Sequence, residues 1–347
     1  MRIGFFCCTF GKSGGMETYA LNLIQAALEL GHKPVVFCMK SDPNLGIRNA
    51  CEVHEYRKPP LIPNKIAVYL FHRWLIKEVP KHKLDVSIGC CTGGLPDVLA
   101  CGGIKEGYLH AMKKKPLLLD KLIINIEKEA YSQAKVVVAH SMMMDRELQR
   151  YYGISSEKIH VLYPPQLLPV VNNDLNRHAL REKYGIRQDQ TVFLFPSSSH
   201  KRKGLPLLEE YFNNTKNDCL LLVVGKPTDD SRNVKSIGFC KQIQELYQLA
   251  DYTILASLYE PLGLVATESV WCGTPAIMSS NCGCAEVISS EAIRSFSPYS
   301  IKDLTALLDD VIQHPIKLSA PFRKYLKLDI NLPPTEHLKK VLALAQA

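Results

Sequence analysis

Short apolar runs bounded by polar residues recur along this chain, and a helical period stands between most of them. In the first half these runs fall near residues 2–9, 34–39, 85–90 and 135–139. Continuous apolar, β-branched runs are typical of parallel strands that helices cover on both faces. The first half is therefore predicted to form an α/β domain around a doubly wound parallel sheet.

The same pattern restarts after the pair Pro164-Pro165, which excludes regular structure and marks a hinge. The later predicted strands are TVFLFP, CLLLVVG, YTILAS and TPAIMSS, and the helical periods are GLPLLEEYFNN, CKQIQELYQLA and GLVATESVWCG. A chain of 347 residues suits two domains of about 150 residues each. Two Rossmann-like domains are expected to face each other across a cleft, because such sheets bind ligands outside the carboxyl ends of their strands.

The predicted boundaries are residues 1–165 for the N-terminal Rossmann-like domain and 166–325 for the C-terminal one. The tail is amphipathic from LTALLDDVIQ onward. Its final segment, 326–347, is predicted to be a helix that packs back on the N-terminal domain.

The turn after the first strand contains two glycines, Gly14 and Gly15. The tripeptide Gly-Lys-Ser before them is not the phosphate loop of a nucleotide hydrolase, because Phe6 stands where that loop needs its first glycine. A helix with a 3.6-residue apolar stripe is expected to start near Glu17. Glycines at such a turn let backbone N–H groups approach an anion; the alternative is that they only make the turn.

The twelve cysteines contain no C-x-x-C pair, and most lie inside apolar runs. Free, buried core residues in a reducing compartment are therefore expected, without a structural metal. No apolar stretch approaches the roughly 20 residues of a membrane-spanning helix, and the opening MRIGFFCCTF is typical of a buried strand rather than a signal peptide. The sequence thus predicts a cytoplasmic protein.

The net charge of +8 is concentrated in residues 1–165, which contain 22 Lys and Arg against 15 Asp and Glu. Contributors are RKPP at Arg57, the stretch from His72 to Lys83, and Lys113 to Lys115. Such a face could meet nucleic acid, acidic lipid headgroups or a phosphorylated acceptor, or could simply be solvated. No nucleic-acid motif is present. Among the binding functions, the more specific prediction is therefore peripheral association with the inner face of the plasma membrane.

Two carboxylates, Glu260 and Glu268, stand in the stretch ADYTILASLYEPLGLVATESVWCGTPAIMSS, one on the loop after a predicted strand and the other on the following helix. The N–H groups of Gly263, Leu264 and Val265 open that helix and can point at an anion. A sugar nucleotide needs such parts: donors for the diphosphate, a carboxylate for sugar hydroxyls and another for the ribose diol. Helix capping alone would also explain the spacing of the two glutamates.

This segment resembles the E-x7-E signature of the family-four retaining glycosyltransferases, which have the GT-B fold. It continues with Ala250-Asp251, Ser257, Gly273, Pro275 and SSNCGCAEVI. Further landmarks follow the family's order along nearly the whole chain: GGMETYALNLIQAALELGH, VVVAHSMMMDRELQRYYGISSEKIHVLYPP and SSSHKRKGLPLLEEYF. Within the family, LACGGIKEGYLHAMKKK and HKRKG are most similar to the lipopolysaccharide core glucosyltransferases of Gram-negative bacteria.

The resemblance implies transfer of a hexose from a nucleotide sugar, with UDP-sugars favoured, to a lipopolysaccharide core or other lipid-linked glycan. Lys203, with Arg202 beside it, would hold the donor diphosphate and stabilise the leaving nucleoside diphosphate. Glu260 would contact the hydroxyls of the transferred sugar, and Glu268 the ribose. Side chains and helix ends meet the charge of the leaving group in this family, so the resemblance implies neither a metal nor a cofactor.

The resemblance also assigns roles in the first domain. Gly14 and Gly15 would approach the donor phosphates. His110, in GYLHAM, is the candidate for a polar residue near the sugar, and a surface or core histidine is the alternative. Asp97 and Glu106 compete for any role as acceptor base.

One position departs from the family pattern. An arginine usually stands six residues before the lysine, and here that position is Ser197. Lys201 or Arg202 would have to supply the missing charge.

The expected partners are a nucleotide sugar, a glycolipid or oligosaccharide acceptor and an anionic membrane surface, with no nucleic acid. Two other functions remain open. A sugar-nucleotide epimerase shares the architecture, although the glutamate pair and the Lys203-Gly204 turn argue against it. A non-catalytic nucleotide-sugar-binding protein would differ from an enzyme in giving no donor hydrolysis.

Overall fold

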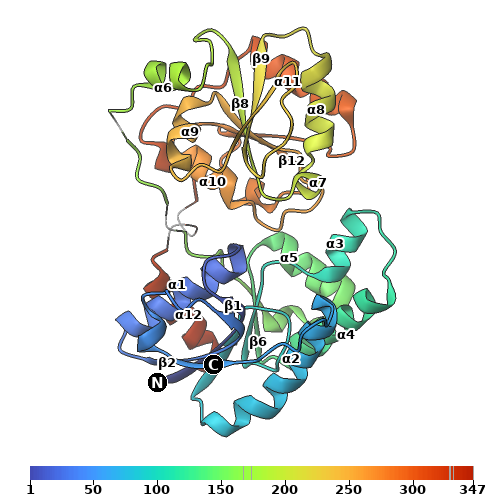
Figure 1. Ribbon diagram of the computed structural model, residues 1–347, viewed down its shortest axis with the longest axis vertical. Helices are drawn as coiled ribbons and strands as arrows, with labels where there is room; N and C mark the ends of the chain where they lie inside the picture. Colours follow the sequence, from blue (N-terminus) through green and yellow to red (C-terminus); the bar gives the residue numbers. More distant parts are fainter. Residues whose placement is uncertain (167, 173, 328–329, 331, 347) are drawn as a thin grey trace. The chain divides into compact units, whose positions relative to one another are not determined.

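The structure is a computed structural model that describes residues 1–166, 168–172, 174–327, 330 and 332–346. The chain divides into two compact units: unit 1 is Met1–Gln166 with Asp329–Ala347, and unit 2 is Leu167–Leu328. Each unit contains a parallel sheet with helices on its faces (Figure 1).

Unit 1 alternates strands with helices and ends with a helix from the far end of the chain. Its strands are β1 (Arg2–Phe10), β2 (Lys33–Ser41), β3 (Glu52–Glu55), β4 (Val86–Gly89), β5 (Val98–Cys101), β6 (Val136–Ala139) and β7 (Ile159–Val161). Its α-helices are α1 (Gly15–Glu29), α2 (Asn64–Glu78), α3 (Lys105–Ala111), α4 (Leu118–Gln133), α5 (Met142–Glu147) and α12 (Pro334–Gln346). Shorter helical turns are η1 (Arg48–Ala50), η2 (Val79–His82), η3 (Leu148–Tyr152) and η4 (Ser156–Lys158).

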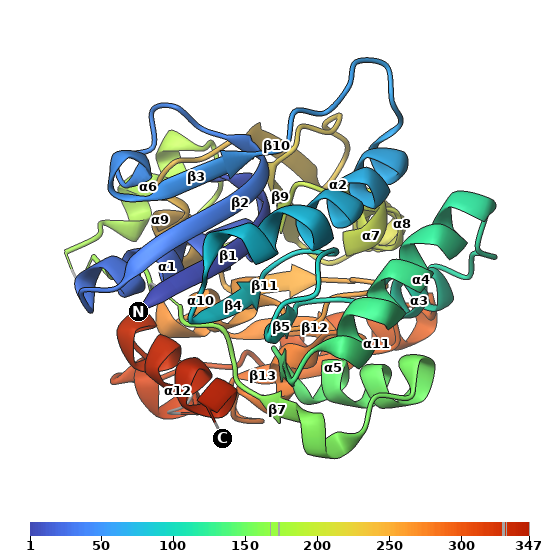
Figure 2. The same ribbon diagram turned by 90° about the horizontal axis from the view of Figure 1, so that it is seen from below.

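The sheet of unit 1 has the parallel order β3-β2-β1-β4-β5-β6-β7. Helices α1 and α12 cover one face, where side chains such as Leu23 and Val341 join the core beneath β1 and β2. On the other face, Phe71 and Leu75 of α2 pack on Phe6 and Phe37, and α2 lies alongside α4 (Figure 2). The central stretches of β1 and β2, which helices cover on both faces, are apolar, as the sequence pattern predicts.

The docking of α12 includes a buried polar contact. The Tyr19 hydroxyl on α1 forms a 3.0 Å hydrogen bond with Nε2 of His337 on α12. The His140 ring packs edge-on against the same tyrosine, with ring centroids 4.4 Å apart. Burial lowers the pKa of His337 to about 4 and that of His140 to about 3, so both imidazoles are neutral at pH 7.

Unit 2 repeats the alternation in a second sheet. Its strands are β8 (Thr191–Ser197), β9 (Cys219–Gly225), β10 (Val234–Gly238), β11 (Tyr252–Leu255), β12 (Ala276–Ser279) and β13 (Ile293–Phe296). Its helices are α6 (Arg177–Lys183), α7 (His200–Lys203), α8 (Leu205–Asn214), α9 (Ile243–Leu249), α10 (Leu264–Trp271) and α11 (Ile301–Gln313), with the short turns η5 (Gly283–Glu286) and η6 (Phe322–Tyr325).

The sheet of unit 2 has the parallel order β10-β9-β8-β11-β12-β13. Helices α6 and α9 bury Leu180 and Leu246 on one face. On the other face Phe212 of α8 packs edge-on against Phe193 of β8, and α11 lies beside α8.

The predicted strands of both halves are present, and the structure adds shorter ones. The prediction missed β3, β5, β7, β10 and β13, which have three to five residues each. β3, β7, β10 and β13 are edge strands, and edge strands need no continuous apolar run because only one neighbour pairs with them.

Two predicted helix boundaries shift. α1 starts at Gly15, not near Glu17, because Gly14 already has extended backbone and serves as its N-cap. The terminal helix starts at Pro334, whereas the prediction covered 326–347; residues 328–329, 331 and 347 lie outside the described residues.

All twelve cysteines are free, and eight of them are buried. Within the described parts of the chain, no helix has both the length and the hydropathy needed to cross a bilayer.

The buried histidines predict acid sensitivity. A histidine whose folded pKa is depressed binds its proton only in the unfolded chain between the two pKa values, so stability falls as pH drops below about 6.5. For His337, with a folded pKa of about 4, the loss reaches up to about 3 kcal/mol near pH 4. Urea unfolding between pH 7 and 4 should show a clearly smaller acid loss in His337→Leu. The exposed control His178→Gln should match the wild type, and equal acid losses in all three proteins would contradict the assignment.

Candidate functional site

The candidate site in unit 2 lies where the strand order reverses. The chain passes from β8 to β9 and β10 on one side, then returns to place β11 on the other side of β8. Loops leaving adjacent β8 and β11 therefore diverge at the same edge of the sheet, which is where open α/β sheets bind ligands. Lys203 lies at the end of the short helix α7 that follows β8, and Glu260 lies in the loop that follows β11.

Gly204 fixes the approach of the two loops. Its φ is +79°, and a Cβ added there would stand 2.0 Å from the carbonyl oxygen of Ala256. Only glycine permits this contact, for steric as well as conformational reasons. The Leu258 N–H also donates to the Arg202 carbonyl at 2.8 Å. The end of α7 is thus held against the end of β11.

Arg202 then orients Glu260. Its Nη1 donates to Glu260 Oε2 and to the Tyr259 carbonyl, both at 2.8 Å. The Glu260 backbone is anchored as well, because its N–H donates to the Asn281 carbonyl and its carbonyl accepts from Gly283. The carboxylate is 16% exposed and Arg202 26%, so the pair is shielded but reachable.

Lys203 is the buried cation of the site. It is 9% exposed, and its Nζ donates to the neutral carbonyl of Pro196 at 3.0 Å. Burial lowers the pKa of Lys203, and the carboxylate of Glu260 partly opposes that shift. No ion pair of Lys203 within 4.0 Å is found among the residues that the structure describes.

Glu268 lies one helix turn into α10. Its Oε2 accepts a 2.8 Å hydrogen bond from the Tyr247 hydroxyl on α9. Burial raises the pKa of Glu268, while the Tyr247 hydrogen bond and nearby Lys203 oppose the shift. Gly263, with φ +88°, caps α10 at its N-terminus, so the N–H groups of Leu264 and Val265 face outward from the helix start.

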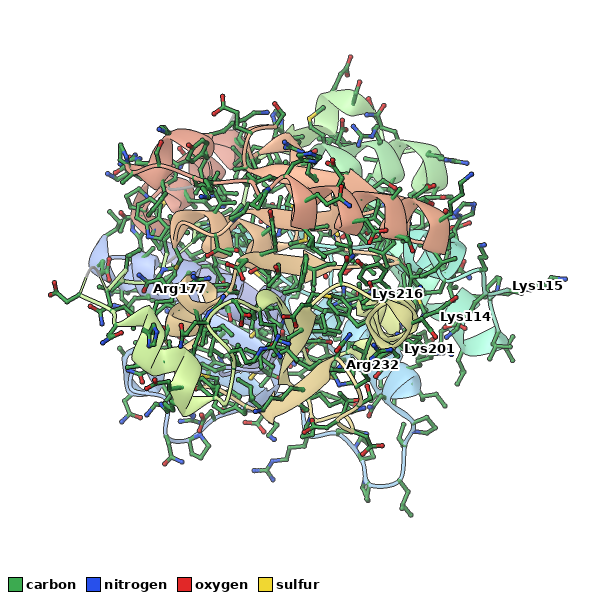
Figure 3. All side chains as sticks on the ribbon, turned by 90° about the horizontal axis from the view of Figure 1, so that it is seen from above. Lys114, Lys115, Arg177, Lys201, Lys216 and Arg232 are labelled. Atoms are coloured by element: carbon green, nitrogen blue, oxygen red, sulfur yellow. The ribbon has the colours of Figure 1, made fainter. Side chains whose placement is uncertain are left out.

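The structure also shows what stands at the position of the missing arginine. Ser197 is 4% exposed, and its hydroxyl lies 3.0 Å from Nδ1 of His200. Lys201 is exposed (Figure 3), whereas Arg202 reaches Glu260. Arg202, not Lys201, is therefore the second cation beside the buried lysine.

Unit 1 has an equivalent switch point between β1 and β4. A cavity of about 200 Å³ lies at this edge, and it is lined by residues that include Cys8, Met16, Glu17, Cys91, Thr92 and Gly102. Gly14 is extended, with φ −164°, and a Cβ on Gly15 would meet nothing within 4 Å. The turn itself therefore does not require glycine at Gly15, either for space or for a positive φ.

The other first-domain candidates lie apart from this cavity. His110 is exposed on α3, with its ring 5.9 Å from that of Tyr151. The Asp97 carboxylate accepts hydrogen bonds from the backbone N–H and the hydroxyl of Ser87 on β4. It also forms an ion pair with Lys135, the residue before β6, so it links these two segments. The cavity lining includes neither residue.

Sequence reasoning missed Tyr247, Asn281 and Glu17. Tyr247 lies in a helix whose apolar spacing predicts a core residue. Asn281 acts through its backbone carbonyl, which accepts the hydrogen bond from the Glu260 N–H. Glu17 was seen only as the expected start of a helix. Tyr247 and Glu17 have no local motif, and the quoted stretch SSNCGCAEVI contains Asn281 without indicating that its backbone carbonyl would hold Glu260.

Two family models match the chain in succession. The model described as Glycosyltransferase Family 4 matches residues 13–165, and the model described as Glycosyl transferases group 1 matches residues 176–329. Together they cover both units apart from the termini and the short link between them.

Known proteins agree with these matches. A probable transglycosylase from Burkholderia thailandensis is 37% identical over 319 residues, which is 90% of this chain and 87% of the relative. Among solved structures, WaaG, a glycosyltransferase involved in lipopolysaccharide biosynthesis, has a TM-score of 0.74 at 18% identity and covers 99% of this chain and 95% of its own. HepE from Anabaena, in complex with UDP-glucose, has a TM-score of 0.67 at 17% identity, covering 100% and 97%. The fold is GT-B, as the sequence predicted.

The contact at Gly204 yields a stability prediction. Gly204→Ala should cost about 3 kcal/mol or more, because the added methyl would overlap the Ala256 carbonyl as well as strain φ. Gly238→Ala is the matched control: its φ is +66° but a Cβ there meets nothing within 4 Å, so it should cost only about 1 kcal/mol. Equal midpoints of urea unfolding for the two variants would contradict the steric argument.

Proposed function

The chain belongs to the family-four, group 1 glycosyltransferases, and from that premise we propose that it moves a hexose from a nucleotide sugar to a lipopolysaccharide core or other lipid-linked glycan, with retention of configuration. UDP-glucose is the proposed donor. The proposal extends the family assignment to a substrate class and a stereochemical outcome.

The buried ammonium of Lys203 is the observation that carries the proposal. A buried cation is costly unless an anion accompanies it, and its present hydrogen-bond acceptor is a neutral carbonyl. A diphosphate would supply the missing charge and would also meet Arg202 and the first N–H groups of α10. The three features lie on segments that follow β8 and β11, at the topological switch point of unit 2.

The proposed reaction assigns a separate task to each group. The bond between the sugar's anomeric carbon and the diphosphate breaks, and an acceptor hydroxyl bonds to the same face of that carbon and gives its proton to the departing phosphate oxygen. Lys203 and Arg202 stabilise the charge that develops on the leaving diphosphate. Glu260 holds the sugar hydroxyls, and Glu268, oriented by Tyr247, holds the ribose.

Residues of unit 1 complete the proposed set. Gly14 and Gly15 present backbone N–H groups to the phosphates, and His110 serves as the polar residue near the sugar. We propose no metal or cofactor in this reaction, since side chains and helix ends supply the positive charge. HepE, a protein of the same fold, has a solved structure in complex with UDP-glucose, and this supports UDP as the nucleotide of the proposed donor.

We further propose that unit 1 docks on anionic membrane. Leu117 and Leu118, at the start of α4, are 70% and 81% exposed, and Lys113 to Lys115 precede them with only Pro116 between. Figure 3 shows Lys114 and Lys115 at the tip of the connection between α3 and α4.

A second exposed tip precedes α2. Leu61 is 102% exposed in the loop before α2, which also contains Arg57 and Lys58. The 2.7 Å ion pair between Lys65 and Asp120 ties the starts of α2 and α4 together. Apolar side chains between cations suit an interface in which leucines enter the bilayer and each cation adds about 1 kcal/mol at an anionic surface.

Glu260 provides the test of activity. The wild type should release UDP from UDP-glucose slowly, and faster when a truncated lipopolysaccharide is added as acceptor. Glu260→Gln should lower kcat at least about a hundredfold with little change in UDP affinity, because its contact strengthens as the sugar departs. Glu182→Gln, an exposed glutamate of the same unit, should behave as the wild type. Absence of sugar transfer by the wild type from any nucleotide donor would overturn the proposed function.

The membrane proposal is tested by vesicle sedimentation. Leu117→Ser/Leu118→Ser and Lys114→Glu/Lys115→Glu should each weaken binding to phosphatidylglycerol vesicles at least about tenfold, the latter with lower salt dependence. Lys33→Glu/Lys40→Glu makes the same charge change at exposed positions of β2 and should bind as well as the wild type. Binding that none of these changes alters would show that the tip is only solvated.

A further inference from the structure

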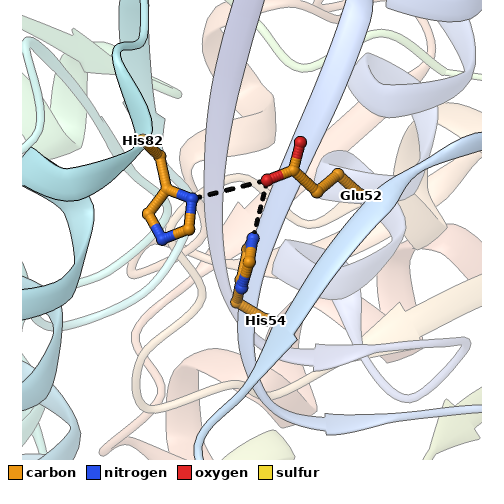
Figure 4. Close-up of side chains that lie close together, drawn as sticks. All are labelled: Glu52, His54 and His82. Carbon is orange, nitrogen blue, oxygen red and sulfur yellow. Dashed lines mark hydrogen bonds and ion pairs between the residues drawn. The ribbon is translucent and has the colours of Figure 1, made fainter.

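Two histidines and a glutamate of unit 1 converge on one point (Figure 4). Glu52 Oε1 lies 2.9 Å from Nε2 of His54 and 3.4 Å from Nδ1 of His82. One ligand atom from each side chain can be chosen so that all three lie within 4.8 Å of one another. We propose that this cluster binds a divalent transition-metal ion of the zinc class.

The local structure explains the convergence. Glu52 and His54 are two residues apart on β3, so strand geometry places both side chains on the same face of the sheet. His82 ends η2, the turn that follows α2 on that face. The Phe37 ring, opposite His54 in the register of β2 and β3, stacks on it at 5.2 Å and packs edge-on against His82. A rigid apolar floor thus supports both imidazoles.

Neighbouring charges orient each ligand. Arg2 donates to Glu52 Oε2 at 2.9 Å, which leaves Oε1 as the oxygen that faces the histidines. Nε2 of His82 lies 3.2 Å from Glu78 Oε1. A carboxylate behind an imidazole is the usual outer partner of a metal-binding histidine, since it fixes the tautomer.

Hydrogen bonds to the two neighbouring carboxylates cannot satisfy both ring nitrogens of a neutral His82. Its two nitrogens face two carboxylate oxygens, of Glu52 and Glu78, and a neutral imidazole can donate to only one of them. If Nε2–H donates to Glu78, the Nδ1 lone pair points at Glu52. A cation held by both imidazole lone pairs and the carboxylate removes this conflict.

The ligand set indicates the class of metal. Two imidazoles and one carboxylate suit Zn²⁺ and its neighbours, with a fourth position for water, whereas Mg²⁺ and Ca²⁺ prefer oxygen ligands. Tetrahedral bonds of about 2.0–2.1 Å separate ligand atoms by about 3.3 Å. The observed 2.9 and 3.4 Å bracket that spacing. The proposal departs from the expectation of no structural metal, which rested on the absence of C-x-x-C pairs.

The site is placed to stabilise the sheet edge, not to catalyse transfer. Arg2 begins β1, whereas the Gly14 turn follows the other end of that strand, about 26 Å away for a strand of this length. β3 is an edge strand, and a bound ion would join it to η2. The inference does not depend on the proposed donor or acceptor.

The test is calorimetric titration of the untagged, chelator-treated full chain with ZnCl₂. One equivalent should bind with a raised thermal midpoint, and His54→Gln and His82→Gln should each bind at least about tenfold more weakly. His178→Gln is the matched control, since His178 also faces a glutamate, Glu182, but stands alone at 3.7 Å. It should bind zinc as the wild type does.

If the histidine variants do not fold, cobalt spectroscopy on the wild type tests the site instead. The free cysteines could also bind metal, so Co²⁺ should give the spectrum of nitrogen and oxygen ligands without a thiolate charge-transfer band. A thiolate band, no binding up to millimolar metal, or folded His82→Gln that binds like the wild type would each overturn the proposal. Loss of binding in His82→Gln with unchanged release of UDP from UDP-glucose would support it and separate it from the transferase site.

Discussion

The close contact between Gly204 and the Ala256 carbonyl is the constraint on which the site of unit 2 depends. It sets the end of α7 directly against the end of β11, at the point where the strand order of the sheet reverses. The backbone hydrogen bond from Leu258 to Arg202 and the side-chain bond from Arg202 to Glu260 follow from that approach. A larger residue at Gly204 would separate the cation loop from the carboxylate loop.

The site contains buried ionisable groups whose lost solvation the protein replaces only in part. Burial lowers the pKa of Lys203 and raises that of Glu268, so both groups have lost solvation that a bound nucleotide sugar would replace. Arg202 and Tyr247 hold the two carboxylates in place beforehand. Preorganised charge of this kind is the main source of transition-state stabilisation when a charged leaving group departs.

Local sequence patterns were sufficient for most strands of the two sheets, which follow from apolar runs. The roles expected of Lys203 and of the glutamate pair were implied by the resemblance to the family, because spacing alone left helix capping open. Contacts between distant segments were not predictable. Tyr247 gave no signal, and the choice of Arg202 over Lys201 required knowing which side chain points toward Glu260. Glu52 and His54 lie on β3, a strand too polar and too short to predict, and His82 ends η2, so the convergence of the three side chains could not be seen before β3 was placed.

Calorimetric titration with UDP in the presence of a chelator tests the central claim most directly, because it asks whether the buried ammonium serves a diphosphate. The account predicts that the wild type binds UDP without metal, that Lys203→Met binds at least about tenfold more weakly, and that Lys201→Met, which removes the same charge two residues away on the surface, binds normally. Equal UDP affinity for the wild type and Lys203→Met, or no binding of UDP, GDP or ADP by the wild type, would contradict it.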